Sequence, residues 1–265
     1  MGFKFLLSAF LFVSLLGKAQ TIDFGFHYNI DAPFKRSMPK MNVNHGADFH
    51  LGYKILNKAP LWINTDISTG CYALKTREEN YFFSDGTQTT TDVQYSSNLH
   101  KFLFGFNYDI GKSANRVSGY LTAQAGYAYM NSKIFIEDPT DVDGCKALEQ
   151  KNTFTYGGGI YAAGGGVRIN LDKKTTSTRL FNHYLDISCK YTAGGNFSYV
   201  NINHMQEHNH AMANSAATAA TRDTRDLTVK FVNVTTKSIH EHKVAEVYTS
   251  PFEIMNIKIG YMVRF

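Results

Sequence analysis

Alternation of apolar and polar residues is the feature that most constrains how this chain can fold. The segment 102–110 is the clearest case, because every second residue from Phe102 to Ile110 is aromatic or aliphatic, and most residues between them are small or polar. Successive side chains of a β-strand point to opposite faces of a sheet. The segment therefore predicts a strand with one apolar and one polar face.

Seven further segments show related patterns, and together they predict an all-β chain. The eight expected strands are at about 22–31, 45–56, 61–77, 93–111, 116–135, 153–171, 181–202 and 250–265. Most contain the run of about nine to eleven alternating residues that a tilted strand needs to cross a bilayer. Beyond residue 19, no apolar run approaches the roughly 20 residues of a helical membrane span.

One of these segments, 153–171, departs from simple alternation. Its apolar residues change from even positions, such as Ile160, to odd positions, such as Val167, across the glycines at 164–166. A β-bulge or glycine kink there would reset the register and bend the strand. A phosphate-binding loop is disfavoured, because the P-loop lysine and a following helix pattern are missing.

The connections between the predicted strands fall into two classes. Short ones (57–60, 112–114, 172–180) alternate with long polar ones (32–44, 78–92, 136–152, 203–249). Tight turns at one end and longer loops at the other are typical of outer-membrane barrels, whereas a soluble β-sandwich does not require this asymmetry. Six aromatic residues are predicted to form an interfacial girdle at the end with the short turns: Phe24, Trp62, Tyr108, Tyr120, Phe181 and Phe265.

The polar faces of the strands predict the content of the barrel interior. Eight strands leave a lumen that side chains nearly fill. Because the inward set carries both signs of charge, we expect its members to pair across the lumen, since unpaired buried charges are costly. The predicted set is Asp48, His50, Lys54, Asp66, Lys101, Asp109, Arg168, Asp186, Lys190, Lys258 and Arg264. A plugged lumen is favoured over a narrow or gated channel, and a wide pore is disfavoured.

The beginning of the chain predicts export. A short basic start at 1–4 precedes an apolar run at 5–17, and Gly17 and Ala19 are small residues at the two positions that a signal peptidase reads. We therefore expect a cleaved signal peptide at 1–19, an alternative being an uncleaved anchor. Residues 20–265 then form the barrel, with a long extracellular insertion at about 203–249.

Several functional classes are disfavoured by composition and by missing motifs. The formal net charge of +5 is too weak to indicate a nucleic-acid partner. No GxSxG motif and no His-x-Ser pair on a strand offers a nucleophile with its base. We therefore expect a protein that is not an enzyme and needs no cofactor.

The segment 203–249 is the longest connection and is rich in histidine. A metal could in principle be held there by His204, His208, His210, His240 and His242. A solvated polar loop that merely tolerates these histidines is the favoured interpretation. Alternation at 227–233 and 239–248 predicts a projecting hairpin, an outward extension of neighbouring strands, or two more membrane strands that would make ten. A projecting sheet edge would suit strand-addition binding.

The last eight residues carry a resemblance to a known family. Lys258, Gly260, Val263 and Phe265 fill the slots of a pattern that resembles the C-terminal signal of bacterial outer-membrane barrels. The whole mature chain resembles the small outer-membrane β-barrel family of Gram-negative bacteria, of the OmpX/OmpA-like kind but without a periplasmic domain. The junction at Ala19 and Gln20 resembles that of exported Bacteroidota proteins.

This resemblance implies a transmembrane antiparallel up-and-down barrel in the outer membrane, surrounded by outer-membrane lipids and inserted by the barrel-assembly machinery. Two functions follow as hypotheses. The first is a structural or interaction barrel, such as an accessory subunit of a protein-export or outer-membrane biogenesis complex, with the segment 203–249 as the contact surface. The second is a narrow, porin-like channel for small solutes. A lipid-modifying outer-membrane enzyme is a weaker third.

Overall fold

The computed structural model describes residues 22–55, 59–82, 88–110, 116–137, 147–172, 181–201, 225–232 and 239–265. Their antiparallel strands are β1 (Ile22–Pro33), β2 (Asn44–Lys54), β3 (Leu61–Phe82), β4 (Gln88–Ile110), β5 (Val117–Glu137), β6 (Ala147–Asn170), β7 (Asn182–Asn201), β8 (Arg225–Val232) and β9 (Ile239–Arg264). Within these ranges, no helix has the length and apolar character needed to cross a bilayer.

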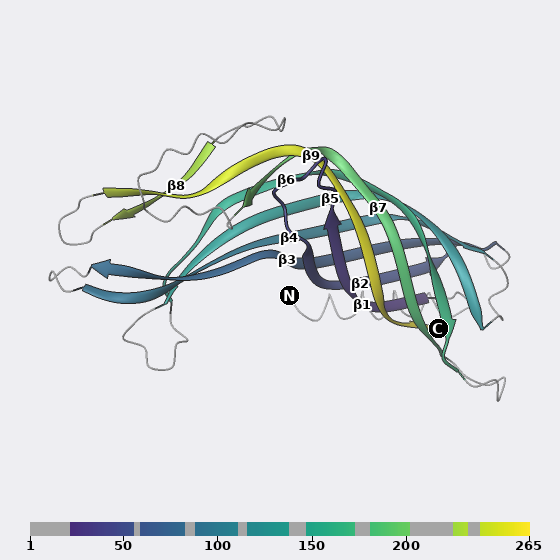
Figure 1. Cartoon of the computed structure of the whole chain (residues 1–265). Helices are drawn as coiled ribbons and strands as arrows, with labels where there is room; N and C mark the ends of the chain where they lie inside the picture. The colour runs from purple at the N-terminus through teal and green to yellow at the C-terminus, as the bar shows by residue number, and fades with distance from the viewer. Residues whose placement is uncertain are drawn as a thin grey trace, which may run out of the picture.

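Eight of the strands close into a barrel (Figure 1). Strands β1 to β7 pair in chain order, β9 pairs with β7, and β9 also pairs with β1 to close the ring. In the described part of the chain, β8 pairs only with β9 and lies outside the closed ring. The predicted eight-stranded antiparallel barrel is confirmed, and the ten-stranded alternative is wrong.

The strands are strongly tilted. Starting at Asp23, the paired residues lead round the barrel through Gly52, Asn64, Gly105, Gln124, Ala162, Thr192 and Ile254 to Pro33. One circuit thus returns to β1 ten residues beyond its starting point. The corresponding tilt lies in the range of about 35–45° that is typical of closed barrels.

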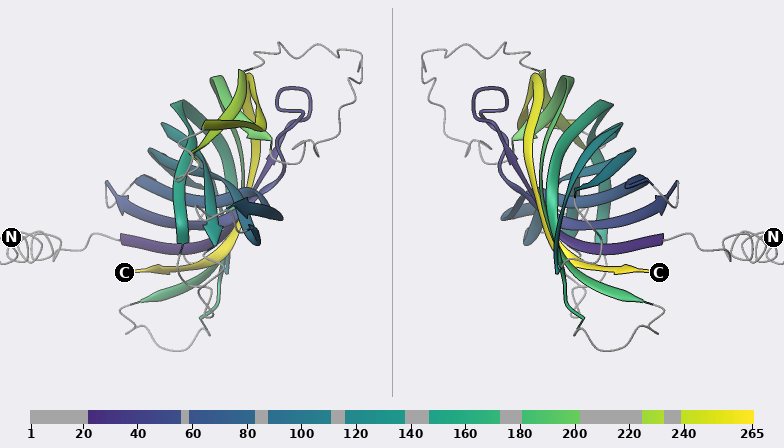
Figure 2. Two further views of the ribbon diagram at one scale, coloured as in Figure 1. Left: turned by 90° about the vertical axis from the view of Figure 1, so that its left-hand side faces the viewer. Right: turned by 90° about the vertical axis from the view of Figure 1, so that its right-hand side faces the viewer.

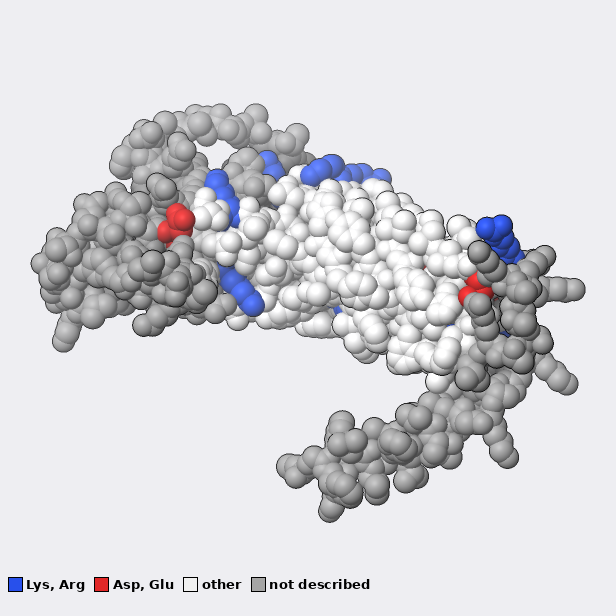
Figure 3. All heavy atoms as spheres, turned by 90° about the horizontal axis from the view of Figure 1, so that it is seen from below, with Lys and Arg blue, Asp and Glu red and all other residues white. Residues whose placement is uncertain are grey.

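The barrel is apolar outside and polar inside, the reverse of a water-soluble protein. On β4, the outward residues Phe102 to Ile110 are each 48–52% exposed, whereas the inward residues Lys101 and Asn107 are 3% and 1% exposed. Figure 3 shows a face whose broad centre is uncharged, with charged side chains toward its ends and along one margin. This is the arrangement that a membrane barrel needs.

Several strands extend beyond the barrel ring. Strand β4 begins at Gln88 and β9 at Ile239, earlier than the predicted 93 and 250. Parts of the predicted loops 78–92 and 203–249 are therefore strand. We call the end that carries Ile22 and Phe265 the terminal rim, and the opposite end, where these extensions lie, the distal end.

The extensions form two separate arms (Figures 1 and 2). The four-stranded arm contains β3 to β6, and the three-stranded arm contains β7, β9 and β8. The arms part where the pairing of β6 with β7 stops, at Ile160 and Gly194. There the register between β7 and β9 shifts between Ala193 and Asn196. Because a bulge bends its strand, this shift accounts for the departure of β7 from β6.

The bulge predicted at 164–166 is wrong. Pairing of β6 with both β5 and β7 is continuous through these glycines. The apolar residues change parity because Ile160 faces a lumen that is apolar at this height, whereas Val167 faces outward. The glycines allow close strand approach instead, since a Cβ on Gly164 would lie 2.2 Å from the carbonyl oxygen of Cys189.

The predicted aromatic girdle is wrong in two places. Trp62 and Tyr120 point into the lumen, where they are only 2% and 7% exposed. The indole N–H of Trp62 donates to Asp109 at 2.9 Å, so its polar atom is satisfied inside the barrel. The remaining four aromatic residues are exposed on the outer surface: Phe24, Tyr108, Phe181 and Phe265.

Candidate functional site

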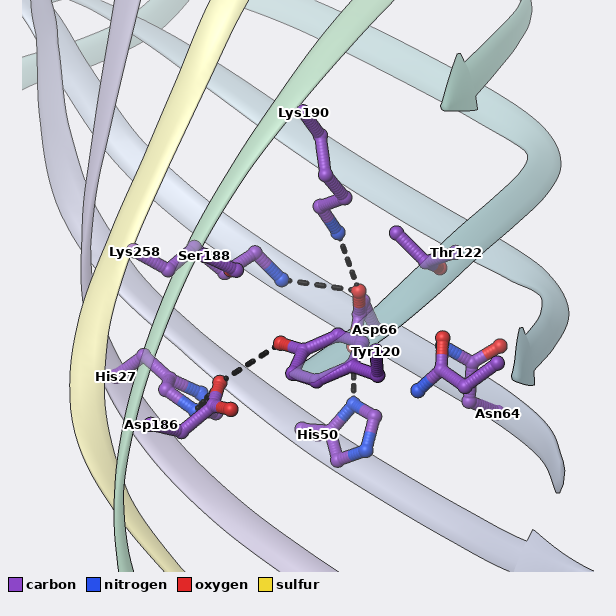
Figure 4. Close-up of a pocket in the computed structure, with 11 residues that line it drawn as sticks. His27, His50, Asn64, Asp66, Tyr120, Thr122, Asp186, Ser188, Lys190 and Lys258 are labelled. Atoms are coloured by element: carbon purple, nitrogen blue, oxygen red, sulfur yellow. Dashed lines mark hydrogen bonds and ion pairs between the residues drawn. The ribbon is translucent and has the colours of Figure 1, made fainter. Parts of the chain in front are cut away.

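Asp66 lies at the centre of a buried polar network in the lumen (Figure 4). Its Oδ2 atom accepts hydrogen bonds from Lys190 at 2.6 Å and Gln124 at 2.9 Å, and the Lys258 ammonium lies 3.0 Å away. His50 Nδ1 is 2.6 Å from the other carboxylate oxygen. One carboxylate therefore links β2, β3, β5, β7 and β9 across the barrel.

Arg168 organises a second cluster, nearer the terminal rim. Its guanidinium lies 2.7 Å from Asp109 and 3.7 Å from Asp186. The same guanidinium stacks 4.1 Å from the centre of the Tyr120 ring. The Tyr120 hydroxyl in turn donates to Asp186 at 3.1 Å, and His27 Nε2 approaches that carboxylate to 3.1 Å.

The closure of the barrel between β1 and β9 is reinforced by side chains. Arg264 donates two hydrogen bonds to Asp23, at 2.7 and 2.8 Å, in the bidentate geometry that makes such pairs strong. Its guanidinium also covers the Trp62 ring at 4.2 Å. These contacts fix the last strand against the first at the terminal rim.

Asp31 anchors a third cluster on the distal side of Asp66. It accepts hydrogen bonds from Asn44 at 2.8 Å and Asn256 at 2.7 Å, and it pairs with Lys101. All four side chains are buried. The polar network therefore extends over much of the height of the membrane-facing barrel.

The charges of the network nearly cancel. Six carboxylates face five lysine and arginine side chains and two histidines in the described lumen: Asp23, Asp31, Asp48, Asp66, Asp109 and Asp186 against Lys101, Arg168, Lys190, Lys258 and Arg264, with His27 and His50. Protonation of a single histidine would make this set neutral. Such balance suits a permanent plug, because an uncompensated charge would be costly in this setting.

The polar network leaves little free space. A small cavity beside Asp66 has room for about one water molecule. Several buried polar atoms of its lining residues have no hydrogen-bond partner among the described protein groups, and His50 Nε2, Asn64 Oδ1 and Thr122 Oγ1 are among them. The cavity is far smaller than the pockets that hold organic ligands.

A second, apolar layer closes the distal half of the lumen. The connection from β1 to β2 inserts Met38 and Met41 into it, and both side chains are fully buried. They belong to a cluster that receives Leu99 and Met130 from the four-stranded arm and Phe252 from the three-stranded arm. The polar interior predicted from the sequence is therefore wrong for this half of the barrel.

The connection that carries these methionines is fastened to β9. The backbone N–H of Phe34 donates to the carbonyl oxygen of Glu253 at 3.1 Å, and the Ser37 hydroxyl donates to the Glu253 carboxylate. The hydrogen bond from Ser37 lowers the pKa of Glu253, with a smaller contribution from Arg36. The carboxylate therefore stays ionised near neutral pH and holds this connection in place.

The structure places the eight residues of the predicted polar network together in the lumen: Asp66, Lys101, Asp109, Arg168, Asp186, Lys190, Lys258 and Arg264. Asp48 and His50 join them, while Lys54 is only partly buried, 5.9 Å from the Trp62 ring. Sequence reasoning missed Asp23, His27 and Asp31. Their alternation with Phe24, Phe26 and Ile30 was the available signal.

The four residues of the predicted assembly signal lie along the end of β9. Lys258 belongs to the lumen network, and Gly260 lets β9 approach β1, since a Cβ there would be 2.2 Å from the carbonyl oxygen of Phe26. The Phe265 ring packs edge-on against Phe181 at 4.9 Å and Phe24 at 5.7 Å. Val263 is paired with Phe24.

Some sequence predictions concern residues that the structure does not describe. The signal peptide at 1–19 and His204, His208 and His210 lie outside the described ranges, and the side chains of His240 and His242 are not described. Within those ranges, no group of three histidine, cysteine or acidic residues could hold a metal ion. The solvated histidine-rich loop, which is favoured over a metal site, and the absence of enzymatic activity stay predictions.

Comparison with known proteins yields only structural similarities. No protein-family model matches the chain, and no curated protein matches it. Its structure is similar to that of Ail, the attachment invasion locus protein of Yersinia pestis, at 10% identity and a TM-score of 0.39, covering 93% of this chain and 97% of that one. It is also similar to Neisserial surface protein A, at 13% identity and a TM-score of 0.36, covering 92% and 95%.

A third similar structure is a major outer membrane protein from Thermus thermophilus. The identity is 11% and the TM-score 0.45, with 93% of this chain and 100% of that chain covered. At these identities and TM-scores, none of the three similarities says anything about function.

Proposed function

We propose that the chain is an integral outer-membrane protein with a closed lumen, whose two arms form a contact surface for another protein of the cell envelope. The observation that carries this proposal is the double closure of the lumen. The ion-paired layer around Asp66 and the apolar layer around Met38 and Met41 fill the two halves of the barrel interior. A barrel closed in this way acts through its surface rather than as a passage.

The placement in the membrane rests on the outer surface. On β9, outward apolar residues run from Phe265 to Met255, and the ionised Glu253 follows. These eleven residues of tilted strand match the apolar band of about 25 Å in outer-membrane barrels. The first barrel strand begins and the last one ends at the terminal rim. In an outer-membrane barrel that rim faces the periplasm, so the arms project outside the cell.

A closed lumen should not conduct ions. Purified protein inserted into a planar lipid bilayer should give no discrete conductance steps, because the two layers together fill the described lumen. A matched variant in which Met38 and Met41 are both changed to alanine should stay silent, since the ion-paired layer remains. Regular single-channel steps from the unaltered protein would contradict the proposal and support the narrow-channel alternative.

Insertion by the barrel-assembly machinery, which the sequence resemblance implies, gives a second expectation. Removing Phe265 should reduce the amount of folded barrel in the outer membrane several-fold, because β9 closes the ring and Phe265 directly follows its last residue, Arg264. Folded protein is measured by its heat-modifiable migration in gels. Phe181→Ala is the control, since it removes the shorter of the two ring contacts of Phe265 but keeps the chain end. Equal losses in both variants would show that the ring contact, not the terminal residue, matters.

A further inference from the structure

In the described part of the chain, the distal end has two strand edges that face each other without pairing. They belong to residues 152–159 of β6 and 195–200 of β7, and we call the space between them the β6–β7 seam. No backbone hydrogen bond joins these two described segments beyond Ile160 and Gly194. One side-chain hydrogen bond crosses the seam, from the Tyr156 hydroxyl to the carbonyl oxygen of Asn196 at 2.8 Å.

The outer face of the seam is open beside Gly159 and Gly195, whereas on the lumen side the Phe197 ring lies against β6, 3.0 Å from where a Cβ on Gly158 would be. A Cβ built on Gly195 would meet no described atom within 4 Å, and one built on Gly159 would meet only the carbonyl oxygen of Gly126, at 4.0 Å. Neither glycine has the positive φ that would strain another residue. Glycine within a strand often marks a place where a ligand or another backbone approaches closely.

The edges of the two arms differ in their charge. By sequence, the free edge of β3 at 73–82 contains Lys75, Arg77, Glu78 and Glu79, and β8 contains Arg225, Asp226 and Lys230. Natural proteins place charges and prolines on free edges to prevent pairing with other chains. Residues 152–159 and 195–200 contain neither a charge nor a proline, although the edge of β6 that does not pair with β7 continues to Ala147 and carries Glu149 and Lys151 there. The two outer edges are thus protected against strand addition, whereas the seam edges are unprotected where they lie nearest the barrel.

These edges define the chemistry of an occupant. A row of unpaired backbone N–H and C=O groups pairs with an extended chain. On the lumen side the seam borders Phe197, which is buried, and Phe154, whereas Thr155 and Asn196 are exposed on the outside. A fitting strand therefore alternates apolar and small polar residues and carries no charge.

We propose that the β6–β7 seam binds an extended, uncharged segment of a partner protein, which pairs with β6 as an additional strand. This inference rests on the proposed function and specifies the contact within the arms. The two proposals can fail separately. A protein that conducts no ions but binds no strand would support the closed lumen and contradict strand binding at the seam.

The experiment uses chemical trapping with a defined probe. The probe is an eight-residue peptide of alternating threonine and valine with one central cysteine, activated as a mixed disulfide. The full-length protein in detergent, with Cys71, Cys145 and Cys189 changed to serine, receives one new cysteine, either Thr155→Cys or Gln94→Cys. Gln94 is the matched control, since it is exposed at the distal end, but β4 is paired on both sides there.

We expect the probe to label the Thr155→Cys protein at least tenfold faster than the Gln94→Cys protein. The advantage should vanish for a probe that is N-methylated at alternate residues and cannot pair. Gly159→Lys, added to Thr155→Cys, should lower the labelling rate about tenfold, whereas Gly119→Lys near the terminal rim should not. Equal labelling at the two cysteines would overturn the proposal. A Thr155→Cys disulfide dimer formed in place of the peptide adduct would also overturn it and indicate a second copy as the occupant.

Discussion

Replacing Phe104 with arginine should lower the free energy of unfolding in a lipid bilayer by about 2–4 kcal/mol, the cost of a cation near the bilayer midplane on the lipid face of a barrel. Phe104 is 48% exposed on the outer face of β4 and lies about midway along its membrane-facing part. Urea titration of protein in phospholipid vesicles measures the change. Trp62 is the single tryptophan and is buried in the lumen, so its fluorescence reports loss of the barrel.

The control for this prediction lies on the same strand. Gln94 is also exposed, but it is beyond the apolar band, where an added cation meets water. Gln94→Arg should therefore change the free energy of unfolding by less than about 0.5 kcal/mol. If Phe104→Arg is no more destabilising than Gln94→Arg, the outer face of β4 is not in contact with lipid, and the membrane assignment is wrong.

The barrel itself could be predicted because alternation is a local signal. A strand such as β4 shows the alternation within about ten residues. The positions of its apolar residues then predict which side chains face outward and which face the lumen. The same parity places Asp66 and Lys190 in one lumen, although they are far apart in the chain. The particular pairs could not be predicted, because they depend on register and on the ten-residue shift around the barrel.

The distal half of the lumen could not be predicted, because there both faces of a strand are apolar. Ile160 faces inward and Val167 outward, so the alternation fails and the sequence suggests a bulge where the strand is regular. Met38 and Met41 lie in a connection rather than in a strand, and no periodic pattern marks their burial. Their adaptable side chains fill irregular space, which is a property of the assembled cluster rather than of the local sequence.

The separation of the arms was likewise invisible in the sequence. The sequence predicts one strand at 181–202, and nothing local shows that β6 stops pairing with it at Gly194. The bulge between Ala193 and Asn196 has this effect only because β7 follows β9 while β6 follows β5. The partner of each strand is a long-range property, and so are the free edges that result.

The largest effect expected inside the barrel follows the loss of Asp66. Changing Asp66 to alanine should lower the free energy of unfolding by about 3–5 kcal/mol, because Lys190 and Lys258 lose a buried counter-charge at 2.6 and 3.0 Å. The same urea titration measures it. Asp92→Ala is the control, since Asp92 is exposed at the distal end and its loss should cost less than about 0.5 kcal/mol.

A double variant separates charge balance from packing. Changing Lys190 to methionine together with Asp66→Ala removes one charge of each sign and leaves Lys258 paired with Asp48 at 2.6 Å. The double variant should therefore be more stable than Asp66→Ala alone, which is a coupling that independent sites do not show. If the double variant is instead less stable by the full cost of Lys190→Met, the network contributes through shape rather than through charge. Packing, rather than charge pairing, would then close the lumen in the layer around Asp66 as well as in the apolar layer around Met38 and Met41.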